Sequence, residues 1–240
     1  TDFSEDDYWY TMNRALGMDE LIYRHGAIMD QYDPEKKIGL IIDEWGNWFD
    51  VEPGTNPGFL YQQNTMRDAI VAGINLNIFN KHCDRVKMAN IAQMVNVLQS
   101  VILTEGEKMV LTPTYHVFHM YKYHQDAELL ESSIDTETIG VDEENKVPNL
   151  NESVSMAEDG TVNITLTNLS ATESYPVELV LLEKEIGEVS AEIVTGDKKA
   201  YNDFDHDSDV VEKAFTDIAN ENGVLKFTIP ACAVMHIAVK

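Results

Sequence analysis

The sequence is poor in cysteine, in basic residues and in long apolar runs, and each shortage excludes a class of protein. The only two cysteines, Cys83 and Cys232, have no CxxC partner, so we expect buried thiols in a reducing compartment rather than disulfides or a zinc site. The 17 basic residues against 42 acidic ones give a net charge of -25, which disfavours nucleic acids and anionic membranes as partners. No apolar run approaches the roughly 18 to 20 residues that a membrane span needs.

The start of the chain also lacks features of a complete protein. Thr1 stands where a methionine would, and no basic segment followed by an apolar stretch marks a signal peptide. We therefore expect a processed chain or a fragment of a longer protein. The predicted location is cytoplasmic, and periplasmic or secreted locations stay open.

The first half of the chain alternates helical and strand patterns, which is typical of βα units around a parallel sheet. A run of apolar residues from Lys37 to Asp43 predicts a parallel strand buried on both faces. A loop rich in glycine and proline follows over residues 46–60. The other predicted elements are a helix over 5–31, a helix over 61–74, a strand from Leu76 to Phe79, and a helix from Asp84 to Leu98 with Asp84 as its N-cap.

The second half has a different pattern, with short runs of period two bounded by turns, which predicts a β-sandwich. The charge changes at the same place. Residues 1–123 hold 17 acidic against 10 basic side chains, and residues 124–240 hold 25 against 7. The predicted strands are 162–167, 177–182, 191–194, 225–229 and 234–239, with a long loop or hairpin over 135–152 and one possible helix over 211–220.

Glu44 is the candidate catalytic residue, because it follows the predicted strand. Enzymes built on parallel barrels place catalytic groups at the carboxyl ends of their strands. Trp45 and Trp48 flank it, and aromatic faces beside a carboxylate are typical of sugar-binding clefts. A strand-end cap or an ion pair would explain an isolated Asp-Glu-Trp equally well. Asp43 should point to the opposite face of the strand and have a structural role.

Two stretches of the sequence carry a resemblance to a known family. Residues 41–102, which begin IIDEWGNWFDVEPGTNPGFLYQQN and contain NIAQMVNVLQSVI, resemble the nucleophile strand and following segment of glycoside hydrolase family 51 α-L-arabinofuranosidases. TPTYHVFHMY resembles the closing barrel helix of that family. The resemblance implies the C-terminal portion of a (β/α)8 TIM barrel over residues 1–123 and a jelly-roll-like β-sandwich over residues 124–240.

The resemblance also assigns roles to three residues. Glu44 matches the catalytic nucleophile, Gln93 matches a glutamine that hydrogen-bonds the arabinose, and Trp48 matches an aromatic residue on the leaving-group side. The implied activity is retaining hydrolysis of terminal non-reducing α-L-arabinofuranosyl groups from arabinan, arabinoxylan or arabino-oligosaccharides, without a cofactor. Gly46 and Asn47 stand where the family often has Asn and Val, which leaves the leaving-group preference open.

One part of the family pattern is missing. The acid/base glutamate of the family lies in a Gly-Asn-Glu motif, and this motif does not occur in the 240 residues. A retaining glycosidase needs two carboxyl groups roughly 5 to 5.5 Å apart. We therefore expect the acid/base to come from a missing N-terminal barrel portion, present as a separate chain or lost segment, and we expect a homo-oligomer.

Other functions fit the same residues. An endoglucanase or a β-xylosidase could use this scaffold and nucleophile, because a fold does not fix the sugar. A non-catalytic carbohydrate-binding or assembly chain would explain the absent acid/base. His116, His119 and His124 lack an HEXXH pattern, and the acidic loop Asn202 to Asp209 lacks the glycine and glutamate of a calcium loop, so no metal site is predicted.

Overall fold

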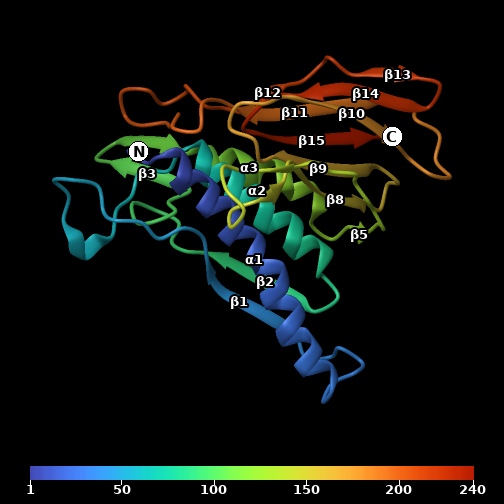
Figure 1. The fold of residues 1–240 in the computed structure, drawn as a ribbon, viewed down its shortest axis with the longest axis horizontal. Helices are drawn as coiled ribbons and strands as arrows, with labels where there is room; N and C mark the ends of the chain where they lie inside the picture. The colour runs from blue at the N-terminus through green and yellow to red at the C-terminus, as the bar shows by residue number, and fades with distance from the viewer.

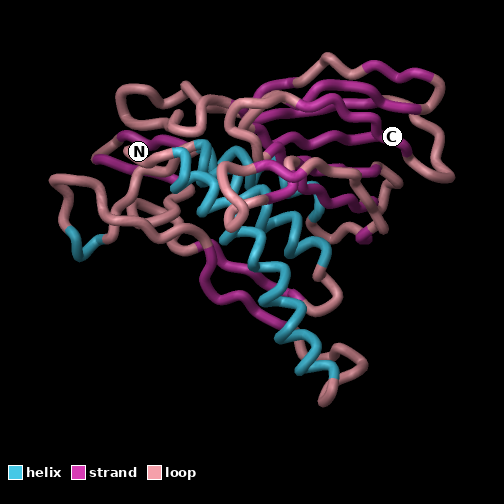
Figure 2. Tube along the Cα trace, in the orientation of Figure 1, coloured by secondary structure: helices cyan, strands magenta, loops and turns pink.

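The computed structural model describes all residues 1–240 and arranges them in three layers. Helices form the middle layer, a β-sandwich covers one side of them, and a pair of parallel strands covers the other (Figures 1 and 2). The helices are α1 (Glu5–Asp30), α2 (Met66–Lys81) and α3 (Pro113–Tyr121), with 3-10 turns at Pro57–Phe59 and Lys122–His124. The parallel strands are β1 (Leu40–Trp45) and β2 (Val86–Ile91), and β3 (Ile102–Glu105) and β4 (Lys108–Leu111) form a hairpin.

Helix α1 begins at a capping box, which confirms the helix predicted over residues 5–31. The Asp7 N–H donates to Ser4 Oγ (3.1 Å), and the Ser4 N–H donates to Asp7 Oδ2 (2.9 Å). Acidic residues fill the first turn, where the helix dipole favours negative charge. The hydrogen bonds that the Ser4 N–H and hydroxyl donate to the Asp7 carboxylate lower the pKa of Asp7.

Helix α2 differs from its prediction at both ends. It starts five residues later than residue 61 and continues through Leu76 to Phe79, so the strand predicted there is wrong. The reason is burial. Nearly every residue of α2 from Met66 to Phe79 is inaccessible to solvent, so its sequence lacks the polar stripe that marks an amphipathic helix.

The helix predicted from Asp84 to Leu98 is also wrong. Residues 86–91 form β2, which pairs with β1 in parallel, and the residues that follow form turns. Asp84 does not cap a helix but forms an ion pair with Lys36. The strand predicted over Lys37 to Asp43 lies at 40–45 and is buried on one face only, since Ile41 is half exposed.

The β-sandwich predicted for the second half is confirmed. Its six-stranded sheet has the order β12-β11-β15-β9-β8-β5, and its three-stranded sheet has the order β10-β14-β13. These strands are β5 (Glu128–Leu129), β8 (Leu150–Met156), β9 (Val162–Asn168), β10 (Tyr175–Val180), β11 (Val189–Thr195), β12 (Lys213–Ala214), β13 (Ala219–Glu221), β14 (Val224–Ile229) and β15 (Ala233–Val239).

All five predicted sandwich strands exist, within one or two residues of their predicted starts. The possible helix over 211–220 is wrong, because these residues supply the edge strands β12 and β13. The stretch 135–152 contains a hairpin of β6 (Thr138–Ile139) and β7 (Val147–Pro148), but its end already belongs to β8, which the sequence analysis missed. Polar residues alternate along β8 because its outer positions face helix α2 through hydrogen bonds.

A polar seam joins the helix layer to the sandwich. Asn77 of α2 lies at its centre and is fully buried. Its Oδ1 accepts hydrogen bonds from Tyr121 (2.8 Å), Ser153 (2.9 Å) and Thr165 (2.7 Å), and its Nδ2 donates to Asn151 Oδ1 (2.9 Å). The satisfied buried amide fixes the register of α2 against β8 and β9.

The two cysteines differ from each other. Cys232 is buried as expected, and burial raises the pKa of its thiol to about 12. Cys83 is exposed, so the prediction of two buried thiols is wrong for this residue, which lies in the turn after α2.

None of the helices is long and apolar enough to cross a membrane.

Two histidines beside each other predict a loss of stability in acid: His236, buried on β15, and His124, half-buried in the 3-10 turn before the sandwich. Burial lowers the pKa values of His124 and His236 to about 4. The unfolded chain takes up these protons near its ordinary pKa of about 6.5, whereas the folded chain does not. The free energy of unfolding should therefore fall as the pH drops from about 6.5 to about 4, by up to about 1.4 kcal/mol per pH unit for each histidine.

The His236→Phe variant keeps a ring that can stack on Tyr123, whose centroid lies 4.5 Å away, and removes one titrating group. Urea unfolding of the complete protein between pH 4 and 8 measures the effect. The variant should lose less stability than the wild type across this window. An equal pH dependence in both proteins would contradict the assignment.

Candidate active site

The carboxyl end of β1 places Glu44 outside the core and Trp45 inside it. Leu40, Ile42 and Trp45 all pack against the helix layer, although in a regular strand Trp45 would face away from the side of Leu40 and Ile42. A register irregularity between Ile42 and Trp45 explains this. It also removes the regular alternation on which the predicted separation of Asp43 and Glu44 depends, and both carboxylates are exposed.

Trp45 therefore does not line a sugar cleft, contrary to its predicted place beside the carboxylate. It is 4% exposed and packs edge-on against Phe79 of α2 and face-on against Phe118 of α3, with ring centroids at 5.3 and 5.9 Å. These contacts hold the end of β1 against the helices, so Glu44 projects from a backbone that is fixed in place.

Gln93 lies at the carboxyl end of the neighbouring strand. Trp45 pairs with Ile91, and the Ala92 N–H donates to the Trp45 carbonyl oxygen (2.8 Å), so Glu44 and Gln93 end adjacent parallel strands at the same edge. Gln93 is exposed and has a φ of 69°, in the left-handed region that non-glycine residues rarely adopt. Such backbone strain is typical of functional sites.

A buried carboxylate, Asp68, connects the loops around Glu44 through hydrogen bonds. It was not among the residues predicted from the sequence. Its Oδ2 accepts hydrogen bonds from the Thr65 N–H (2.8 Å) and hydroxyl (3.1 Å), which caps α2. Its Oδ1 accepts from Asn47 (2.8 Å) in the loop after β1 and from Gln99 (3.0 Å) in the segment after β2. The spacing Thr65-x-x-Asp68 is the capping signal that could have identified it.

Gly46 makes this arrangement possible. Its φ of +123° is unfavourable for other residues, and a Cβ at this position would lie 2.7 Å from Cγ of Gln99. The loop can therefore turn sharply after Trp45 and still contact the segment after β2. Glycine at position 46 therefore suits both the backbone conformation and the contact with Gln99.

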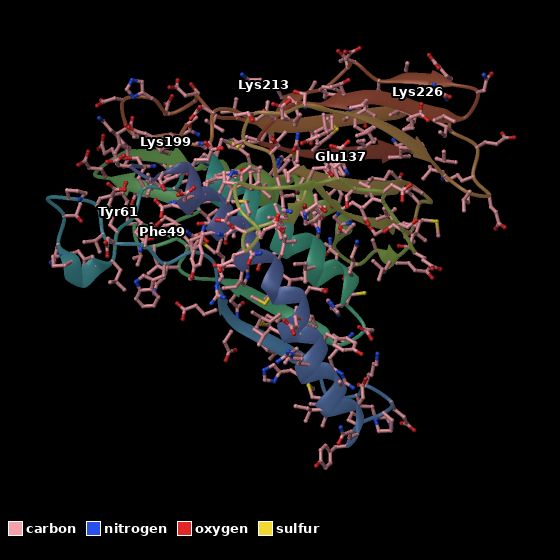
Figure 3. The ribbon with its side chains drawn as sticks, in the orientation of Figure 1. Phe49, Tyr61, Glu137, Lys199, Lys213 and Lys226 are labelled. Atoms are coloured by element: carbon pink, nitrogen blue, oxygen red, sulfur yellow. The ribbon has the colours of Figure 1, made fainter.

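The rest of the loop after β1 presents Trp48 to solvent and packs Phe49 on Arg67 of α2. Trp48 is 65% exposed, whereas the next residue, Phe49, is held in place. Gln62 accepts a hydrogen bond from the Phe49 N–H (2.9 Å) and donates one to the Phe49 carbonyl (2.6 Å). Figure 3 shows Phe49 and Tyr61 on this loop. Trp48 is thus an exposed aromatic side chain on an anchored backbone.

The histidines of α3 lie elsewhere. His119 Nδ1 contacts Glu212 Oε2 at 2.8 Å, and His116 is buried beside the same carboxylate. The structure contains no group of three or more His, Cys, Asp or Glu side chains with the geometry of a metal site.

A strand-end carboxylate on βα units that pack against a β-sandwich is typical of glycoside hydrolases. The chain belongs to the family described as Alpha-L-arabinofuranosidase C-terminal domain, within glycoside hydrolase family 51, and the family model matches residues 43–233. This confirms the resemblance found in the sequence.

Individual relatives agree with this assignment. An intracellular exo-α-L-arabinofuranosidase of Bacteroides ovatus is 43% identical over 241 residues, which cover 100% of this chain and 47% of that protein. The crystal structure of the GH51 arabinofuranosidase from Xanthomonas axonopodis pv. citri has a TM-score of 0.97 at 45% identity, over 100% of this chain and 49% of that one. An α-L-arabinofuranosidase from Thermotoga maritima shares the fold, with a TM-score of 0.76 at 22% identity, over 98% of this chain and 49% of that one.

The chain spans about half the length of the relatives it matches. It corresponds to their C-terminal part. This agrees with the absence of the Gly-Asn-Glu motif from residues 1–240.

Asp68→Ala should disturb the site and the fold together. The change removes the cap of α2 and releases Asn47 and Gln99, so we expect a loss of stability of about 1 to 3 kcal/mol. In the complete protein the turnover number should fall on every substrate, because the loops beside Glu44 lose their common anchor. Asp217→Ala, at an exposed position, is the matched control. Normal stability of Asp68→Ala in thermal melts would show that Asp68 is not the anchor.

Proposed function

We propose that the complete protein is a retaining exo-α-L-arabinofuranosidase and that residues 1–240 supply the nucleophile half of its active site. The observation that carries the proposal is the position of Glu44. Its exposed carboxylate ends a strand whose neighbour ends at Gln93, beside the exposed Trp48. Relatives from Bacteroides ovatus and Bifidobacterium longum, both named exo-acting α-L-arabinofuranosidases, support it.

The proposal includes the domain division. Residues 1–123 would form the last βα units of a (β/α)8 barrel, and residues 124–240 the C-terminal sandwich. The two parallel strands β1 and β2 support this, because their outer faces carry Ile41 and Met88, which are 51% and 52% exposed. Six further strands from an N-terminal half would cover these side chains and pair the open edges.

The proposed chemistry divides between the two halves. Glu44 would attack the anomeric carbon and form a glycosyl ester, while a carboxylic acid from the N-terminal half protonates the departing oxygen. The same group would then remove a proton from water, which attacks the ester and restores Glu44. No step needs a cofactor.

The proposed substrates are terminal non-reducing α-L-arabinofuranosyl groups on arabinan, arabinoxylan or their oligosaccharides. Relatives from Streptomyces lividans and Bacillus subtilis are named intracellular exo-α-(1→5)-L-arabinofuranosidases, which supports an intracellular location and a linkage to test first. The homo-oligomer stays a prediction. A panel of nitrophenyl glycosides separates this activity from endoglucanase and β-xylosidase activity.

Glu44→Ala should abolish turnover of the complete protein on every substrate, including those with activated leaving groups, because the attack itself is lost. Added azide should restore release of the leaving group and give an arabinosyl azide of inverted configuration, since the small anion fills the vacated space. Glu105→Ala, on the exposed hairpin β3–β4, is the control.

Trapping with a fluorinated arabinofuranosyl inhibitor, followed by peptide mass spectrometry, identifies the esterified residue. A label on Asp43, or a Glu44→Ala variant that keeps more than about a tenth of the wild-type turnover number, would overturn the assignment.

Gln93 and Trp48 should affect different kinetic constants. Gln93→Ala should lower kcat, because hydrogen bonds to sugar hydroxyls tighten toward the oxocarbenium-like transition state. Trp48→Ala should mainly raise KM for oligosaccharides, since its exposed ring would contact the leaving group. Steady-state kinetics on an aryl arabinofuranoside and an arabino-oligosaccharide measure both. A kcat of Gln93→Ala within about twofold of wild type would indicate uniform binding instead.

A further inference from the structure

A cavity lies beside the candidate site, between helix α1 and the loop after β1. Its volume is about 920 Å³, near the upper end of the range of small-ligand sites, roughly 300 to 1,000 Å³. It starts at Gly46, two residues after Glu44, and continues past Trp48 to Tyr10 on α1. We call it the α1 cleft. None of the roles assigned above uses its α1 side.

A buried arginine without a hydrogen-bond partner lines the α1 cleft. Arg67 is 5% exposed, and its guanidinium lies between the rings of Phe3 and Phe49, at 3.8 and 3.7 Å from their centroids. Its Nε has no hydrogen-bond partner, and burial lowers the pKa of Arg67. A buried donor without an acceptor is costly in a folded protein, and no side chain of residues 1–240 accepts from the guanidinium of Arg67, so this group is available to a hydrogen-bond acceptor that enters the cleft.

The other lining groups indicate what kind of acceptor fits. Acidic side chains outnumber basic ones in the lining, with Asp2, Asp7, Asp50 and Glu52 against Arg14 and Arg67, so an anionic ligand would be repelled. A neutral ligand with many hydroxyl groups can accept from Arg67 and donate to the carboxylates.

Exposed aromatic side chains complete the cleft. Trp48 at one end and Tyr10 on α1 are 65% and 55% exposed, and Arg14 lies 5.7 Å from the centroid of the Tyr10 ring. Aromatic faces combined with hydrogen-bonding groups of both kinds are what sugar rings require, because their C–H faces are apolar and their hydroxyls donate and accept.

We infer that the α1 cleft is an extended subsite for the neutral polysaccharide chain on the leaving-group side, with Arg67 as its buried hydrogen-bond donor and Tyr10 as its far stacking platform. The inference rests on the proposed function, because the chain would enter the cleft past Trp48 from the bond that Glu44 attacks. We expect an aryl arabinofuranoside, which has no polysaccharide chain, not to contact Tyr10.

The experiment compares Tyr10→Ala with wild type in the complete protein, on a nitrophenyl arabinofuranoside and on an arabino-oligosaccharide of at least four units. The measured quantity is the ratio of kcat/KM for the oligosaccharide to kcat/KM for the aryl substrate. Loss of one stacking face should lower this ratio about three- to tenfold. Tyr23→Ala is the matched control, since Tyr23 is 68% exposed on the same helix and lies outside the cleft.

Arg67→Met should lower the same ratio, because it keeps the stacked side chain but removes the donors. If Tyr10→Ala leaves the ratio unchanged, the inference is overturned. If the same variant also has a lower melting temperature, Tyr10 packs against the N-terminal half, which fills the cleft instead. Failure of the wild type on every arabinofuranoside would remove the proposed function. In that case calorimetric titration of wild type and Tyr10→Ala with the oligosaccharide still tests the cleft, and equal affinities would overturn it.

Discussion

The burial of α2 on all sides is the constraint on which the rest of the structure depends. The helix packs between α1 and α3 and on β8, β9 and β15 of the sandwich, and its Phe79 packs on Trp45 at the end of β1. Gly73 permits this approach, because a Cβ there would lie 2.5 Å from Thr167 Oγ1 and 3.0 Å from Val234 Cγ2. A larger residue would push the sandwich away from the helix, and with it the hydrogen bonds of Asn77.

The same helix connects the core to the candidate site. Its N-terminal carboxylate, Asp68, anchors the loops after both parallel strands, and Phe79 near its other end packs on Trp45. The position of the Glu44 backbone is therefore fixed by packing that lies wholly within residues 1–240. Preorganisation of this kind is what a nucleophile needs, because small displacements from the reacting carbon lower the rate.

The sequence predicted those parts of the fold whose signals are local. The capped helix α1 was found because one of its faces meets solvent. Strand β9 was found because apolar residues alternate with polar ones along it, although the polar residues are buried and Thr165 among them bonds to Asn77 of α2. The limits of α2 were missed because an enclosed helix shows no polar stripe, and β2 was missed because its mixed sequence VKMANI places Val86 and Ala89 at a spacing that also fits a helix.

The candidate site shows the same division. Glu44 and Gln93 could be named from strand-end position and family resemblance, but Asp68 and Arg67 act through contacts with residues far away in the sequence. Trp45 was misplaced because the irregularity in β1 depends on the helices beneath it. Such side chains can be assigned only when the packing around them is known.

The division of the proposed enzyme into two halves has a physical consequence for catalysis. The nucleophile is anchored within this chain, whereas the acid would be anchored in the N-terminal half, so their separation depends on how the open edges of β1 and β2 pair with the missing strands. A retaining mechanism tolerates only a narrow range of separations, roughly 5 to 5.5 Å. The exposed side chains of Ile41 and Met88 would pack against the missing strands in the barrel interior. Because such an interior is close-packed, this packing would fix the position of β1, and with it the separation of the two carboxyl groups.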